Sequence, residues 1–364
     1  MFKKLAICAA ATLAASGAFA QSSVSLYGRF DTALQVQNNQ ATGAPISSVN
    51  TGSPSRTKID SGAISGSRFG FRGSEDLGGG TAAIFTLEGG FNPGTGRSGQ
   101  GGALFGRQAF VGAKSGWGQV TLGRQYSTMF DHFGTFDAFG ISNADNTAFY
   151  ASYDAGGLRV NNSIRYGYSG GGIDASLMYG TGGVAGSTSA QSFVGFGVAY
   201  AAGPLGVGFA YDTKNLNNQA GTNNFKTTNT MFGASYAFGP AKVLGNYMVT
   251  NTNTAANPKS NLFSLGGTFD LSPQVGLTAA YYNDKTNVNG GQTGKRNTFG
   301  LQATYSLSKR TLVYGYADTT KISGAYSGTS STTPNGVADA AGVWSASNGA
   351  SGQNTFMLGL RHSF

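Results

Sequence analysis

The stretch Thr298-Phe299-Gly300-Leu301-Gln302-Ala303-Thr304-Tyr305-Ser306-Leu307 alternates between apolar residues and polar or small residues without a break. Successive side chains on a β-strand point to opposite faces, so this stretch predicts a strand with one apolar and one polar face. A soluble β-sandwich would turn the apolar face toward its core, whereas a membrane barrel would turn it toward lipid. One strand is compatible with both, and the number and spacing of similar stretches decide between them.

Sixteen such stretches follow one another along the chain, separated alternately by short and long connections. An even number of strands brings both ends of a barrel to the same side of the membrane. We therefore predict an all-β protein: a transmembrane antiparallel β-barrel of sixteen strands, with short periplasmic turns and long extracellular loops. The predicted strands are 22–37, 64–73, 79–92, 103–113, 118–125, 159–167, 172–180, 192–202, 205–213, 226–238, 240–251, 259–270, 273–284, 297–307, 310–319 and 354–364.

The connections between these strands fall into two sets. The short set is rich in Gly, Pro and Ser, which favour tight hairpin turns. The long set is dominated by Asn, Thr, Ser and Gly and is typical of extracellular loops. The predicted turns are 74–78, 115–117, 168–171, 203–204, 239, 271–272 and 308–309, and the long loops include 38–63, 126–158 and 320–353.

The first twenty residues read as a secretory signal peptide. Lys3 and Lys4 precede an apolar run from Leu5 to Phe19, and residues 18–20 fit a cleavage site. The alternative is an N-terminal membrane anchor, but the run is shorter than the roughly 20 residues that a spanning helix needs. Residues 21–364 then form the barrel, and they lack the only cysteine, Cys8, which excludes disulfides and thiolate metal sites from the mature protein.

Composition excludes several other classes of protein. Charged residues make up only 11% of the chain, yet no later stretch approaches 18 consecutive apolar residues, which argues against a helical membrane protein. The 59 glycines might suggest disorder, but the aromatic residues, 12% of the chain, are spaced within alternating runs. The net charge of +9, or +7 without Lys3 and Lys4, comes from scattered residues and not from a basic run, so no nucleic-acid partner is expected.

Strand parity assigns charged residues to the inner face of the barrel. Phe69 and Phe71 take the lipid side of their strand, which turns Arg68 and Arg72 inward. Further inward residues on the same argument are Arg29, Glu88, Arg159, Arg165 and Arg361, with Val160, Ile164 and Tyr166 opposite the two arginines of their strand. Arg107 is less clear, because Gln108 and Phe110 are assigned to the outer face. Each arginine could alternatively do no more than neutralise a neighbouring carboxylate.

Tyrosines near the strand ends are candidates for the aromatic girdles at the two membrane interfaces. They are Tyr27, Tyr166, Tyr200 and Tyr247, and the alternative is that they are buried core residues.

The loop 126–158 is the best candidate for a functional loop. It contains Asp131, Asp137, Asp145 and Asp154 and no Lys or Arg. A loop of this length without evident regular structure is usually functional. If it folds inward, its carboxylates oppose the wall arginines and set up a transverse field; the alternative is a solvated external loop.

Four motifs carry a resemblance to a known family. The chain resembles the Gram-negative general porins, specifically their beta-proteobacterial branch, over essentially all of residues 21–364. The resemblance implies a sixteen-stranded trimeric outer-membrane channel whose third loop folds into the pore, with a wall cluster at Arg68, Arg107 and Arg159. Residues 137–140 (Asp-Ala-Phe-Gly) replace the Pro-Glu-Phe-Gly-Gly motif of the enterobacterial branch. The motifs are Val24-Ser25-Leu26-Tyr27-Gly28, residues 67–80 (SRFGFRGSEDLGGG), Leu122-Gly123-Arg124-Gln125 and residues 159–166 (RVNNSIRY).

We expect a Gram-negative outer-membrane diffusion channel that passes small hydrophilic solutes and ions and prefers anions, because inward basic residues outnumber inward acids. The expected constriction comprises Arg29, Arg68, Arg72, Glu88, Arg107, Asp131, Asp137, Arg159 and Arg165. Expected partners are two further copies of the chain in a homotrimer, outer-membrane lipid and lipopolysaccharide, and the barrel-assembly machinery, for which the aromatic end at Phe364 resembles an assembly signal. No cofactor or metal is expected.

The sequence fits two other function classes less well. An outer-membrane hydrolase would need a nucleophile with an orienting base, but His132 and His362 lie in no recognisable motif and no Gly-x-Ser-x-Gly elbow occurs. A third class is a barrel that acts mainly as an adhesin or structural tether, and the absence of a passenger domain counts against it.

Overall fold

The computed structural model describes residues 23–39, 55–61, 64–142, 149, 153, 157–217, 225–253, 258–287, 293–324 and 351–364. The predicted signal peptide and the loop residues Asp145 and Asp154 lie outside these ranges. No helix among the described residues is long and apolar enough to cross a membrane.

The structure is a closed antiparallel barrel with sixteen strand positions, which confirms the predicted fold. Two short strands, β2 and β3, pair with successive halves of the same edge of β1 and together fill one position in the barrel. The seventeen strand segments therefore occupy sixteen positions. The barrel closes where β1 pairs with β17, from Arg29 opposite Ser363 to Gln37 opposite Thr355. The strands are β1 (Ser23–Gln37), β2 (Arg56–Ser61), β3 (Arg68–Gly78), β4 (Thr81–Gly90), β5 (Gln108–Ser115), β6 (Gly118–Tyr126), β7 (Arg159–Gly170), β8 (Ile173–Gly180), β9 (Phe193–Ala202), β10 (Leu205–Asn215), β11 (Lys226–Phe238), β12 (Ala241–Asn253), β13 (Lys259–Asp270), β14 (Val275–Asn287), β15 (Thr293–Ser306), β16 (Thr311–Gly324) and β17 (Gly352–Ser363).

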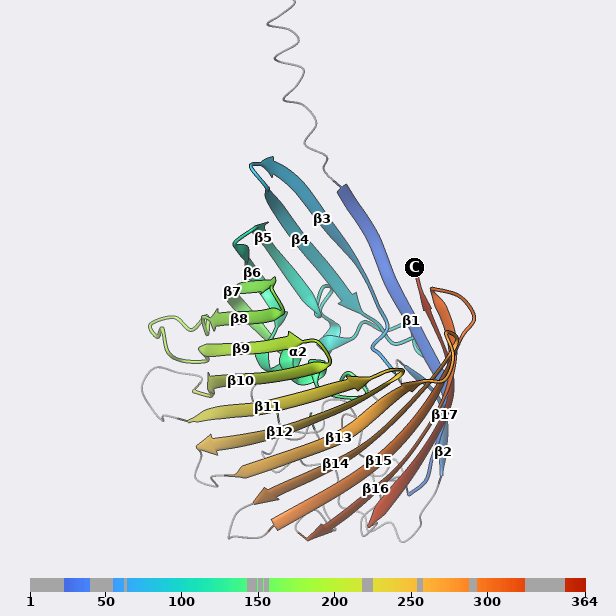
Figure 1. Cartoon of the computed structure of the whole chain (residues 1–364). Coiled ribbons are helices and arrows are strands. Elements are labelled where there is room, and N and C mark those ends of the chain that lie inside the picture. The colour runs from blue at the N-terminus through green and yellow to red at the C-terminus, as the bar shows by residue number, and fades with distance from the viewer. Residues whose placement is uncertain are drawn as a thin grey trace, which may run out of the picture.

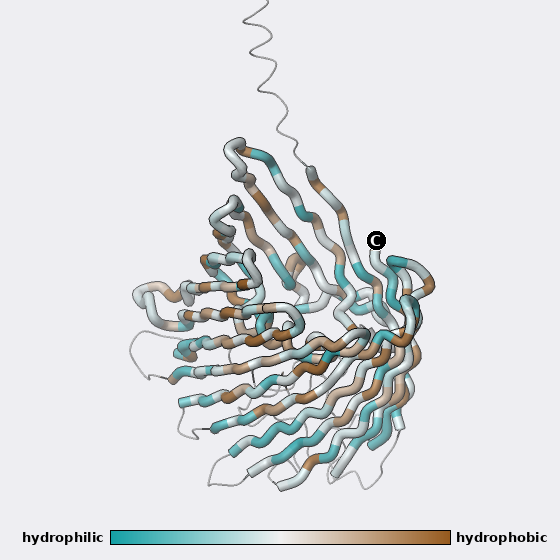
Figure 2. The backbone as a smooth tube through the Cα atoms, in the orientation of Figure 1, coloured by the Kyte–Doolittle hydropathy of each residue, from teal (hydrophilic) through white to brown (hydrophobic). Residues whose placement is uncertain are grey.

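Alternation of side chains produces an apolar outer wall. Along β11, Met231 is fully buried while its neighbour Phe232 is 58% exposed, and the same alternation runs through most strands. Figure 2 shows it as apolar and polar bands that alternate along the tube. Exposed apolar rows on the outside and polar rows on the inside are what a barrel in lipid requires.

The loop between β6 and β7 folds into the barrel, as predicted. Its described part contains the helix α2 (Thr128–Thr135), which begins where the Ser127 hydroxyl accepts a hydrogen bond from the backbone N–H of Phe130 at 3.2 Å. Met129 and Phe133 on this helix are fully buried. Figure 1 shows α2 within the ring of strands, close to β9 and β10, which it contacts.

Some predicted boundaries were wrong. The turn expected at 74–78 is strand: β3 continues to Gly78 through a bulge near Asp76, and the chain reverses at Gly79 and Gly80. Residues 78–80 all have positive φ, which glycine adopts without steric cost. The strand expected from 103 begins only at Gln108, after a 3-10 turn at Gln100–Gly102, and β2 lies within a stretch predicted to be loop.

Candidate pore constriction

Two arginines meet at one tyrosine on the inner wall. Arg107 donates to the Tyr126 hydroxyl at 2.5 Å, and Arg159 donates to the same oxygen at 3.1 Å. Both guanidinium groups also lie over the Tyr126 ring, at 5.8 and 4.7 Å from its centroid. Tyr126 in turn stacks on Phe130 of α2, with ring centroids 4.5 Å apart. A π face and a phenol oxygen both attract cations, so Tyr126 holds two like charges close together.

Glu88 is the carboxylate in contact with this group. Its Oε1 accepts from the Arg107 Nε at 2.7 Å, and its Oε2 accepts from the Tyr27 hydroxyl at 3.1 Å. The Arg72 guanidinium lies 5.1 Å from the centroid of the Tyr27 ring. Tyr27 therefore faces the lumen, and its assignment to the outer aromatic girdle was wrong.

Three further arginines extend the basic cluster. Arg68 lies within electrostatic range of Arg107, Glu88 and Arg29. Arg29 donates to the Ser65 hydroxyl at 3.2 Å and lies within electrostatic range of Arg361 and Asp31. The structure thus places these arginines on one stretch of the inner wall, from β17 through β1 and β3 to the residues before β5.

Arg165 lies beside the cluster, because its Nη1 donates to the Tyr126 carbonyl oxygen at 3.5 Å. Its Nη1 lies 2.7 Å from Asp131 Oδ2, at the start of α2. Asp131 therefore pairs directly with a wall arginine, and this pair ties α2 to β7.

Asp137 does not line the pore opening in this structure. It is buried, and its carboxylate accepts from the Tyr282 hydroxyl at 2.6 Å and from the backbone N–H of Ile141 at 2.7 Å. Burial raises the pKa of Asp137 above its ordinary value, against the opposing effect of these hydrogen bonds. Asp137 thus holds the segment that follows α2 against β14.

A second fastening joins the loop to β10. The Tyr153 hydroxyl contacts Asp212 Oδ2 at 2.6 Å and the Ser127 hydroxyl at 2.8 Å. Burial and the nearby Asp212 carboxylate raise the pKa of Tyr153 well above its ordinary value. Sequence reasoning missed Tyr153 and Tyr126, since an isolated tyrosine in a loop carries no distinguishing pattern.

Glycines on the inner wall form the seat of the loop. The Phe136 ring packs where Gly208 of β10 and Gly233 of β11 leave space: a Cβ built at either would lie within 2.4 Å of that ring. Gly197 likewise leaves space for His132, and Gly266 for Ala138. The sequence could have indicated where the loop packs, because these strands carry glycine at inward positions and bulky residues at outward positions.

Parity failed at two strands near the cluster. Phe110 lies opposite Thr86, which lies opposite the inward-facing Arg72, so Phe110 also faces inward. Its neighbour Val111 is exposed on the outer face. The prediction that Gln108 and Phe110 face outward was therefore wrong. Arg107 precedes β5, and a bend in the chain brings it to Glu88. On β7, Asn162 has a φ of +50° at a register shift, and Val160 is buried against Met178 and Phe193 on the inner side. A bulge adds one residue and reverses the parity of what lies beyond it.

Arg124, which lies in a family motif, was not expected at the site. It donates to the Gly106 carbonyl oxygen at 2.8 Å and to the Asn161 side chain, and it lies within electrostatic range of Arg159. Its register partner Ala109 continues the outward row of Leu87 and Phe71, so Arg124 lies near Arg159 but on the outward side of β6.

Phe364 lies at the barrel closure, next to β1. Its backbone exchanges two hydrogen bonds with Gly28, at 3.0 and 3.1 Å, and its ring covers the Gly28 Cα, where an added Cβ would meet it at 2.3 Å. Within the described ranges, no group of three or more His, Cys, Asp or Glu side chains could hold a metal ion.

A closed barrel that is apolar outside and charged inside, with a loop folded into its lumen, is an outer-membrane channel. The model of the Gram-negative porin family matches residues 6–325, and the chain belongs to that family. It is an outer-membrane porin of the Gram-negative type.

Relatives support this assignment over most of their length. An outer membrane porin protein of Bordetella pertussis is 31% identical, over 87% of this chain and 94% of the relative. Outer membrane porin protein 32 of Delftia acidovorans is 32% identical, over 86% and 88%. Among solved structures, the anion-selective porin from Comamonas acidovorans is 26% identical, with a TM-score of 0.74 over 94% of this chain and 100% of that one.

Proposed function

We propose that the protein is an anion-preferring diffusion channel for small hydrophilic solutes, working as a homotrimer. The observation that carries the proposal is the convergence of Arg107 and Arg159 on the Tyr126 hydroxyl, with Glu88 as the contacting carboxylate. Arg29, Arg68 and Arg72 add positive charge to the same wall. The anion selectivity named for the Comamonas porin points the same way.

The acidic residues in the described part of the loop do not balance this excess. Asp131 is taken up by Arg165, and Asp137 is buried against Tyr282. The net field at the constriction is therefore positive. One unit charge about 4 Å from an ion is worth about 1 kcal/mol even at the dielectric constant of water, so a few arginines in excess of the acids shift anion preference several-fold.

The test is the zero-current potential of planar bilayers under a salt gradient. Replacement of Arg68, Arg107 and Arg159 together by Ala should move the potential toward cation preference at 0.1 M salt. Near 1 M salt, where the Debye length is about 3 Å, wild type and variant should nearly coincide. Removal of Arg107 leaves Glu88 buried without its partner, so the double variant R68A/R159A, which keeps that pair, is measured as well.

A matched control removes the same charge outside the lumen. Lys226, Lys259 and Lys321 are exposed on the outer face, and their replacement by Ala should leave the potential unchanged. If both arginine variants kept the wild-type potential, the pore would be wide and indifferent to charge, and the proposal would fall.

The proposal extends to export and assembly. We propose that residues 1–20 direct export and are removed, and that Phe364 is read by the barrel-assembly machinery. The position of Phe364 against Gly28, at the closing pair of strands, supports the second point.

A further inference from the structure

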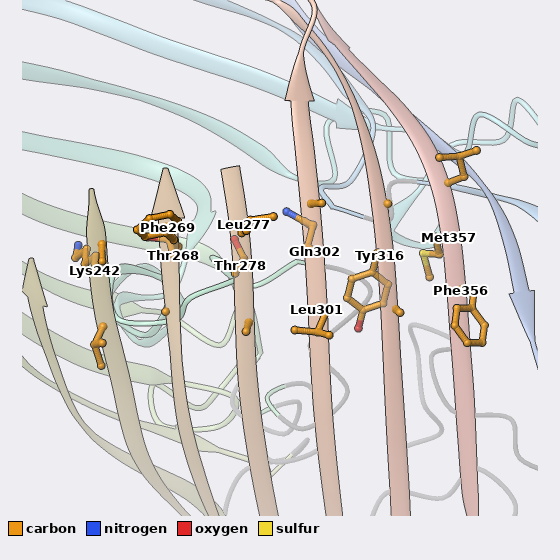
Figure 3. Close-up of a pocket in the computed structure, with 18 of the residues that line it drawn as sticks. Lys242, Thr268, Phe269, Leu277, Thr278, Leu301, Gln302, Tyr316, Phe356 and Met357 are labelled. Carbon is orange, nitrogen blue, oxygen red and sulfur yellow. The ribbon is translucent and has the colours of Figure 1, made fainter. Parts of the chain in front are cut away.

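Phe110 is a large apolar side chain on the inner wall of the barrel. Apolar side chains suit the outer wall, where Figure 3 shows Leu277 and Phe356 at a groove of about 880 Å³. Phe110 is half-buried instead and lies in register with Thr86 and Arg72, whose side chains face the lumen. Contact with lipid therefore does not explain this residue.

The Phe110 ring is open on the side of β6. Its register partner on that strand is Gly123, which has no side chain to cover the ring. Among the described residues, two buried apolar clusters lie inside the barrel, one beneath the loop and one around Val160, and Phe110 belongs to neither. Part of the ring is therefore presented to the solution in the lumen.

Ile84 extends this apolar surface. It is two residues from Thr86 on β4 and shares its inward face, and it lies opposite Gly112, two residues from Phe110 on β5. Such diagonal neighbours on one face of a sheet have Cα atoms roughly 7–8 Å apart, which is within reach of aromatic and long side chains. Gly112 places no side chain between them. Phe110 and Ile84 thus form one small apolar patch on the wall.

Arg72 supplies a positive charge beside the patch. It lies opposite Thr86 and diagonally from Ile84. The side chain is exposed, and its guanidinium lies 5.1 Å from the centroid of the Tyr27 ring. A cation next to a half-buried aromatic ring is complementary to a solute that carries a negative charge and an apolar body.

The carboxylates nearest in the strand pattern are engaged elsewhere. On β3 and β4, the acids that share the inward parity of Arg72 are Asp76 and Glu88. Glu88 accepts from Arg107, and Asp76 accepts from the backbone N–H of Gly78 in the turn. In the described part of these two strands, no carboxylate therefore competes with a solute for Arg72.

The patch lies next to the constriction on its periplasmic side. Glu88, which holds Arg107, is opposite Gln108, and Phe110 follows two residues later in the direction of the short turn after Ser115. Two residues of a strand span about 7 Å. An anion that has passed the Glu88–Arg107 pair from outside therefore meets Arg72 and Phe110 next.

We propose that Arg72, Phe110 and Ile84 form a binding site for aromatic carboxylates on the inner wall. Arg72 donates to the carboxylate, and the ring of the solute packs against Phe110 and Ile84. Arg72 and Phe110 are two strand spacings apart, roughly 10 Å, a span that an extended arginine and a ring-bearing acid cover together. The site rests on the anion preference proposed above and names the class of organic anion that gains most from it.

The test compares benzoate with acetate, which carries the same charge without a ring. Each is added to 0.1 M KCl, and the concentration that halves the chloride current of single channels in planar bilayers is measured. Contact between two aromatic rings improves affinity about 2- to 10-fold, so benzoate should act at a concentration lower than acetate by about that factor. The ratio of the two concentrations cancels changes that affect the pore as a whole.

Three variants assign this ratio to residues. Phe110→Ala should bring it close to one, whereas Phe110→Tyr keeps the ring and should keep the ratio. Arg72→Gln should raise both concentrations, by about 5-fold for the loss of one unit charge near the anion. Val111→Ala is the matched control, because it trims the next side chain of β5 on the outer face, where Val111 is 58% exposed, and should leave the ratio unchanged.

The same ratio in wild type and F110A, or unchanged concentrations in R72Q, would overturn the site. The proposed function is read separately, from the zero-current potential in a KCl gradient without either acid. A potential that shows no anion preference would refute the proposed function, whatever the ratio. An anion-preferring potential together with equal effects of benzoate and acetate would refute the aromatic site alone.

Discussion

Replacement of Gly233 by Ala should loosen the loop that enters the barrel. A Cβ at this position would stand 2.4 Å from Cδ2, 2.5 Å from Cγ and 2.8 Å from Cβ of Phe136. Carbon atoms pack at about 3.5–4.0 Å, so the ring must retreat by roughly 1 Å. Gly208, whose own added Cβ would meet the ring at 2.2 Å, blocks movement toward β10, and the ring must move toward the lumen.

The cost of such overpacking is about 1–3 kcal/mol, which favours the undocked loop roughly 5- to 150-fold relative to wild type. The assay is single-channel recording in planar bilayers, with the frequency of transient closures and the open-channel noise as readouts. Gly315→Ala is the matched control, because a Cβ there meets nothing within 4 Å. The variant G233A should be noisier than G315A, and the second change Phe136→Leu should partly restore quiet currents. Identical recordings from G233A and G315A would refute the idea that Phe136 seats the loop.

Two further predictions concern the loop anchor and the barrel closure. Because burial raises the pKa of Asp137, its contribution to loop docking is complete below the ordinary carboxyl pKa and is lost as the pH rises through the raised value; open-channel noise should therefore increase from acid to neutral pH in wild type, and Asp137→Asn should abolish this dependence, whereas an unchanged pH profile would contradict it. Deletion of Phe364 removes two hydrogen bonds to Gly28 and the ring that covers it, so the amount of porin in the outer membrane should fall while pulse-labelled synthesis stays constant; Phe364→Tyr, which keeps an aromatic ring, should assemble normally, and normal levels of the deletion would refute a role in assembly.

The strands that could be predicted from the sequence are those in which the period of two is unbroken. The run that contains Phe299 and Leu301 is such a case, because lipid on one side and polar neighbours on the other dictate every second residue. The failures come where the backbone departs from that period. The bulge at Asn162 turned Val160 inward, and the bend before β5 placed Arg107 independently of parity.

The candidate site was predicted in its charges but not in its contacts. Parity placed Arg68, Arg72 and Glu88 on the inner wall, where the structure has them. It could not show that Asp137 is buried against Tyr282, because the two residues are far apart in the chain and only the folded loop brings them together. The same holds for Tyr126, whose role depends on two arginines from different segments.

The pairing between β1 and β17 determines how the barrel can fold and insert into the membrane. Gln37 pairs with Thr355, which lies near the other end of the chain. The conformational entropy of closing this long loop is therefore lost before the hydrogen bonds between β1 and β17 can stabilise the barrel. Before β1 and β17 pair, the sheet has two open edges. Each backbone N–H or C=O group left unpaired in hydrocarbon costs roughly several kcal/mol. A half-built barrel therefore has no stable place in the membrane. Insertion and closure have to be nearly one event, and a defect in either terminal strand should cost the cell the entire channel instead of part of it.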